Sequence, residues 1–201
     1  MGYPSGVQAP RMRVIPAALA AVALAAALAS AGCGSSGPAT DGPLSGGAFG
    51  SISGGSDCSP GRVGQPVTFG DERFTNHGHA TLVLDRVGLR HPLHVRLVGS
   101  YAVPGMGLVG VGLGFPPTYS GLPSTWKHRQ PVHAFRLEAG KSFDMALGVA
   151  ATGGPPARSP GMVIYYHDPA GSYVADDHFA MIIAVGRRQC GLGAGASVSG
   201  Q

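Results

Sequence analysis

Short runs in which apolar and polar residues alternate constrain the fold of this chain more than any other feature. In the cleanest run, Phe143, Met145, Leu147 and Val149 share one face of a strand. The other alternating runs are Val67/Phe69, Leu82/Leu84, Leu93/Val95/Leu97, Phe135/Leu137 and Phe179/Met181/Ile183/Val185, and the apolar run Met162–Tyr166 predicts a further strand. No long stripe of helical period occurs outside residues 14–29. About seven or eight short strands at regular spacing predict an all-β, antiparallel β-sandwich.

The composition agrees with a turn-rich β-protein. The chain has 34 glycines, and only 12% of its residues are charged. Its net charge is +4, which falls to +2 when Arg11 and Arg13 are left out. No cluster of basic residues exceeds the pair Arg187-Arg188. We therefore expect no nucleic-acid partner, since nucleic-acid binding requires a concentrated basic patch.

A turn separates two of the predicted strands. Asn76-His77-Gly78-His79 lies between Val67/Phe69 and Leu82/Leu84, and Gly78 is free to take a positive φ. This strand, Asn-X-Gly, strand pattern resembles the first hairpin of many bacterial extracellular immunoglobulin-like sandwiches. The resemblance implies an immunoglobulin-like arrangement of the strands.

The segment Arg11–Cys33 has the three parts of a secretory signal. Arg11 and Arg13 are followed by an apolar Ala/Leu/Val run over residues 14–29 and then by small residues. A charged start, an apolar centre and a small-residue cleavage site are typical of a signal peptide. We predict that residues 1–32 are removed on export.

Ser30-Ala31-Gly32-Cys33 resembles a bacterial lipobox, although Ser30 stands where leucine is usual and Leu28 lies two positions too early. The resemblance implies lipidation of Cys33, with palmitate among the acyl chains, and attachment to the extracytoplasmic face of the cell membrane. Two or more chains would hold the protein firmly, whereas one holds it marginally. An uncleaved membrane helix and a released protein remain open.

Composition divides the rest of the chain. We predict a lipidated N-terminus and Gly/Ser-rich tether over residues 33–62, a sandwich domain over 63–190 and a disordered tail over 191–201. With Cys33 lipidated, Cys58 and Cys190 remain as an even pair in an oxidising compartment. We expect them to form a disulfide, with two free thiols as the alternative.

Histidines are the most chemically suggestive residues of the predicted domain. His77 and His79 are two apart, and the sequence His91-Pro92-Leu93-His94 could fold both imidazoles together. Imidazole suits copper and zinc, so these four residues are candidate metal ligands. The opposing interpretation is that the histidines are solvated at turns and on polar faces.

Other patterns predict no catalytic site. Residues 105–110 match G-x-G-x-x-G, but the glycines and Pro116-Pro117 that follow do not allow the helix that a dinucleotide site needs. No nucleophile elbow, H-E-x-x-H or C-x-x-C motif occurs. Asp168, Asp176, Asp177 and His178 form a weak candidate cation site, in which the aspartates more often cap their own turns.

Six further aromatic side chains could line a binding surface: Tyr101, Tyr119, Trp126, Tyr165, Tyr166 and Tyr173. We therefore expect a membrane-anchored, non-catalytic binding or structural module of the cell envelope, without a cofactor. Its partner would be an envelope protein or a wall polymer. The alternative is an envelope lipoprotein that binds copper or zinc through the four histidines.

Overall fold

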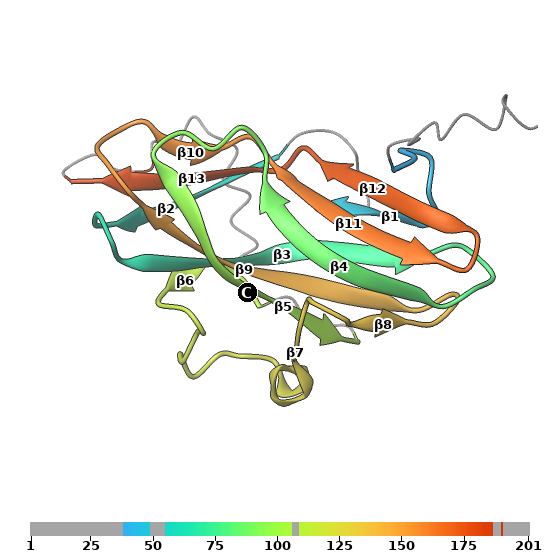
Figure 1. Cartoon of the computed structure of the whole chain (residues 1–201). Coiled ribbons are helices and arrows are strands. Elements are labelled where there is room, and N and C mark those ends of the chain that lie inside the picture. The colour runs from blue at the N-terminus through green and yellow to red at the C-terminus, as the bar shows by residue number, and fades with distance from the viewer. Residues whose placement is uncertain (1–37, 49–54, 106–108, 187–189, 191–201) are drawn as a thin grey trace, which may run out of the picture. The chain divides into compact units, whose positions relative to one another are not determined.

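The computed structural model describes residues 38–48, 55–105, 109–186 and 190 (Figure 1). Within them it has thirteen strands and one 3₁₀ helix, η1. Their bounds are β1 Leu44–Ala48, β2 Ser56–Gly61, β3 Pro66–Asn76, β4 Leu82–Leu89, β5 Val95–Pro104, β6 Gly112–Leu113, η1 Ser124–His128, β7 Gln130–Pro131, β8 Arg136–Leu137, β9 Ser142–Ala151, β10 Ala157–Ser159, β11 Met162–Asp168, β12 Gly171–Asp177 and β13 Ala180–Val185. The all-β prediction is confirmed.

The strands form three sheets. The largest has the order β1-β3-β9-β5-β7, with β6 also paired to β3, and the second has the order β12-β11-β4-β8. The third has the order β10-β13-β2. Every pairing between these strands is antiparallel except that of β13 with β2, which is parallel. Short strands add to the predicted seven or eight, because β6, β7 and β8 contain two residues each.

One hydrophobic core lies between the sheets. The largest sheet contributes Phe143, Met145, Leu147 and Val149, each at most 1% exposed, which is the face that the alternating run predicts. The facing strands contribute core side chains that include Leu82, Leu84, Met162, Ile164, Tyr166, Met181 and Ile183. The predicted antiparallel β-sandwich is therefore present.

Strand β9 is buried on its second face as well. On this face Ala146 of β9 belongs to a smaller apolar cluster with Val103, Val109 and Trp126. A Cβ at Gly99 would lie 2.8 Å from Cε1 of Phe115, and one at Gly148 would also collide with that ring. Glycine at these two positions lets the Phe115 ring lie on the sheet. The long β5–β7 connection therefore packs against the outer face of β9.

The predicted tether over residues 33–62 is wrong in its described part, because it contains β1 and β2. Strand β1 pairs with β3 from Leu44↔Asn76 onward, and β2 pairs with β13. Gly46 belongs to a paired strand, where a Cβ would lie 2.7 Å from the Cα of Phe74. The role of this glycine is to let two backbones approach closely, and not to make the segment flexible. The ordered domain therefore begins before residue 63.

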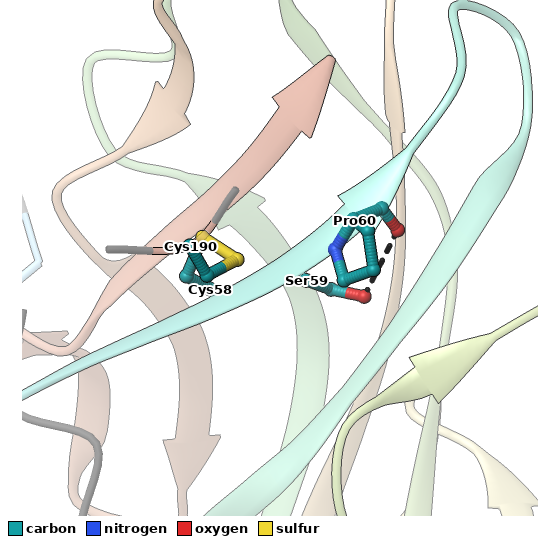
Figure 2. The surroundings of a disulfide bond; sticks show 4 residues. All are labelled: Cys58, Ser59, Pro60 and Cys190. Atoms are coloured by element: carbon teal, nitrogen blue, oxygen red, sulfur yellow. Dashed lines mark hydrogen bonds between the residues drawn. A yellow bond between two sulfur atoms is a disulfide. The ribbon is translucent and has the colours of Figure 1, made fainter. Parts of the chain in front are cut away.

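The predicted disulfide is present (Figure 2). It joins Cys58 of β2 to Cys190 across 132 positions of sequence, with 5.6 Å between the Cα atoms. The signal peptide, Cys33 and the tail over 191–201 lie outside the described residues. Among the residues that are described, no helix has the length and hydropathy to cross a bilayer.

We predict that Cys58→Ser combined with Cys190→Ser lowers the free energy of unfolding by up to about 5 kcal/mol, because a long closed loop restricts the unfolded chain. Denaturant unfolding of the oxidised protein and of the variant measures the difference. The reduced wild-type protein should behave like the variant. Equal stability of all three would contradict the prediction.

The buried carboxyl of Asp177 should make stability depend on pH. Burial raises the pKa of Asp177 above 3.8, although backbone N–H groups of Phe179 and His178 offset part of this rise. The folded state therefore favours the protonated acid, and its contribution to stability is present below pH 3.8 and lost as pH rises through the folded pKa.

We accordingly expect Asp177→Asn to be more stable than wild type above that folded pKa, with the difference vanishing as the pH falls toward 3.8. Unfolding measured as a function of pH checks this. The exposed Asp41→Asn variant is the control and should follow the wild-type profile. A constant difference at every pH would be evidence against the effect.

Candidate functional site

The four candidate histidine ligands are not brought together. His77 and His79 precede β4, whereas His91 and His94 follow it. Eight strand residues separate the pairs by about 26 Å, at the usual rise per residue. In the described part of the chain, no three His, Cys, Asp or Glu side chains gather in a way that could hold a metal ion. The predicted four-histidine cluster is therefore wrong.

The acidic candidates are also divided. Asp168 lies in the β11–β12 turn, where its Oδ1 accepts hydrogen bonds from the N–H groups of Ala170 and Gly171. Asp176 and His178 lie at the opposite end of β12 and contact Arg90. Asp168 thus caps its own turn, and no shared cation site results.

The aromatic candidates fall into separate groups. Tyr166 is buried in the core and stacks on Tyr173 at 5.4 Å between ring centroids. Tyr165 lies beneath the guanidinium of Arg86, whose Cζ is 3.5 Å from the ring centroid. Tyr101 meets Trp126 edge to face, and the Tyr119 hydroxyl donates to the carbonyl of Val109. The predicted common aromatic surface is therefore not formed.

What the fold does assemble is one end of the sandwich, which we call the entry end. It comprises residues 38–43, 76–81, 104–105, 130–142 and 168–172. Asn76, fully buried, holds much of it together. Its Nδ2 donates to the carbonyls of Ala80, at 2.8 Å, and Leu137, at 3.0 Å. Its main chain exchanges hydrogen bonds with residues 140–141, so the β3–β4 and β8–β9 turns form one unit.

Residues 39–44 dock at the same end. The N–H of Ala39 donates to Ser172, and the N–H of Val174 donates to Ala39, which extends the edge of β12. The N–H of His77 donates to the carbonyl of Pro43 at 2.9 Å. Further along, the N–H of Leu44 donates to the buried Tyr166 hydroxyl at 3.1 Å. The chain therefore enters the domain here, fixed at several points.

Gly78 makes this docking possible for a different reason from the one predicted. Its backbone does not adopt a positive φ. A Cβ at Gly78 would instead lie 2.8 Å from Cβ of Pro43. The predicted turn is confirmed, and its glycine serves the close approach of the entering chain.

A cavity of about 390 Å³ opens at the entry end. Pro104, Phe135 and Leu137 supply apolar lining. The polar lining residues are Gln130, Arg136, Glu138, Lys141 and Ser142. Such a volume is within the range of small-ligand sites, and Arg136 with Lys141 gives the cavity one more positive than negative side chain.

Basic residues continue beside this cavity. Residues 105–141 carry Lys127, Arg129, Arg136 and Lys141 but only one acid, Glu138. Helix η1 adjoins the cavity, because a Cβ at Gly105 would lie 3.4 Å from Cγ2 of Thr125. Arg129 lies over Trp126, with its Cζ 4.7 Å from the ring centroid, as in a cation–π contact. This side of the entry end can attract anions.

Apart from Glu138, the acids of the entry end lie elsewhere. Asp41 belongs to the entering chain, and Asp168 caps the turn before β12. The entry end is therefore basic toward β7 and β8 and acidic toward β12. The sequence contained the basic bias of residues 105–141, but only the strand order reveals that the entering chain docks at the same end.

No protein-family model matches the chain, and no curated protein matches it. Among solved structures, the Vibrio cholerae VesB protease has 12% sequence identity and a TM-score of 0.36, over 70% of this chain and 32% of the protease. The ASH/PapD-like domain of human CEP192 (PapD-like domain 7) has 11% identity and a TM-score of 0.36, over 73% of this chain and 87% of that one. Likeness at this level carries no argument about function.

We predict that Gly42→Val releases the entering chain. A Cβ at this position would collide with the Tyr166 hydroxyl and lie 2.8 Å from the Tyr173 ring. Hydrogen exchange should accelerate at the amides of Leu44 and Val174 while the amide of Leu147, in the centre of β9, stays protected. Gly88→Val is the control, because no atom lies within 4 Å of a Cβ there. Equal exchange in both variants would show that the segment is not held by this contact.

Proposed function

We propose that this protein is an exported lipoprotein, anchored through Cys33 to the extracytoplasmic face of the cell membrane, that acts as a non-catalytic binding or structural module. The observation that carries the proposal is the order of features in Arg11–Cys33: two arginines, an apolar run, small residues and a cysteine. The described domain begins almost immediately after this segment.

The disulfide supports an extracytoplasmic location. Structural disulfides persist in oxidising compartments and are rare in the cytosol. Cys58 and Cys190 come from nearly opposite ends of the domain sequence and pair with each other. Cys33 is the remaining cysteine of the chain, which leaves it available for a lipid.

The entry end supports a binding role. Its cavity combines apolar lining with Arg136, Lys141 and Gln130, a set suited to recognising a ligand. Metal binding by the four histidines has no corresponding support, since β4 separates the two pairs. The partner that we favour is a component of the cell envelope.

The test is Cys33→Ala in the full-length chain, expressed in bacteria fed radiolabelled palmitate. We expect the wild-type protein to carry label and to sediment with membranes, and the variant to lose the label. Ser35→Ala is the control and should be labelled normally. An unlabelled wild-type protein would refute lipid anchoring, and mass spectrometry of its N-terminus would then separate an uncleaved helix from a released protein.

A further inference from the structure

The segment between Cys33 and the folded domain is shorter than the tether that the sequence predicts. If the chain is anchored at Cys33, its first hydrogen-bonded residue in the described domain is Ala39, six residues later. Six extended residues reach about 20 Å. A tether over residues 33–62 would reach roughly 100 Å by the same rule. An anchored domain would thus be held close to the bilayer.

The place of attachment also selects which end is near the membrane. Ala39 pairs beside Ser172, at the start of β12. From there the contacts run from Pro43 to His77, and from Asn76 to residues 140–141, which border the cavity. A linker of this length would keep the entry end, with its cavity, toward the surface of the membrane. The ends of the strands at Arg96 and Arg158 point the other way.

The distribution of charged side chains would orient the entry end relative to the membrane. Lys127, Arg129, Arg136 and Lys141 lie on the side of β7 and β8, with Glu138 among them. The other acids of this end, Asp41 and Asp168, lie on the side of β12. A negatively charged membrane attracts the basic side and repels the acidic side, so the domain would tilt β7 and β8 toward the lipid.

We propose that the cavity at the entry end binds the phosphate headgroup of an anionic phospholipid in the membrane to which the chain is anchored. The inference rests on the proposed lipid anchor for its geometry. Arg136 supplies a planar guanidinium, which can form two parallel hydrogen bonds to a phosphate, and Lys141 supplies a second positive charge. Gln130 and Ser142 can donate further hydrogen bonds.

The experiment uses the chain from Gly34 to Gln201, which lacks the signal and the anchor. This part should fold alone, since all described strands, the core and the disulfide lie within a compact unit that starts at Pro38. Binding is measured by co-sedimentation with vesicles of phosphatidylglycerol and phosphatidylcholine, and with vesicles of phosphatidylcholine alone. We expect binding to the anionic vesicles only.

The variant Arg136→Gln with Lys141→Gln should bind the anionic vesicles about thirtyfold more weakly, since each basic residue at a membrane surface contributes about fivefold. The matched control is Arg96→Gln with Arg158→Gln, which removes the same charge at the opposite end. The control should bind like wild type, and circular dichroism should show that both variants fold.

Three outcomes would overturn the inference. The first is no binding of the wild type to anionic vesicles, and the second is an equal loss in both double variants. The third is binding of free glycerol phosphate as tight as that of vesicles, which would assign the cavity to a soluble phosphate compound. None of these outcomes affects lipidation of Cys33, which the palmitate labelling tests separately.

Discussion

Burial of β9 on both faces is the constraint on which the rest of the structure depends. Its odd-numbered side chains from Phe143 to Val149 fill the core, and its even-numbered positions are Asp144, Ala146, Gly148 and Ala150. The small residues leave room for a second layer. Asp144, fully buried, receives two hydrogen bonds from Arg73 on the neighbouring strand, at 2.8 and 3.4 Å. A buried carboxylate needs such a partner, because an isolated one is expensive to desolvate.

This second layer explains why the β5–β7 connection is so long. Trp126, Val109 and Phe115 can cover β9 only if the chain leaves β5 and returns to β7 across the outer face of the sheet. The return brings Lys127 and Arg129 beside the cavity that Arg136 and Lys141 line. The requirement to cover the central strand therefore also concentrates basic residues at the entry end.

Alternation predicted most of the strands that form the core, because a strand with one buried face has a period of two. It could not predict β1 and β2, because their sequences LSGGA and SDCSPG show no periodic pattern of apolar residues. Glycine was the main source of error. At Gly46 and Gly78 it serves close packing against Phe74 and Pro43, which depends on partners distant in sequence. The prediction of a four-histidine site was wrong for a related reason. Residues that are near each other in sequence lie far apart when a whole strand, here β4, separates them.

The docking of residues 39–44 changes what an anchored domain of this kind can do. A domain on a long flexible tether samples a large volume, and its effective concentration at any one surface is low. If the proposed anchor at Cys33 holds the chain, six residues between the anchor and Ala39 would confine the domain to the membrane surface, and the effective concentration of headgroups around it would rise accordingly. A cavity with two basic side chains would need little intrinsic affinity for a headgroup under those conditions. The polar hydrogen bonds that fix the entering chain, from Ala39 to the Tyr166 hydroxyl, would then matter as much for membrane contact as the basic residues themselves.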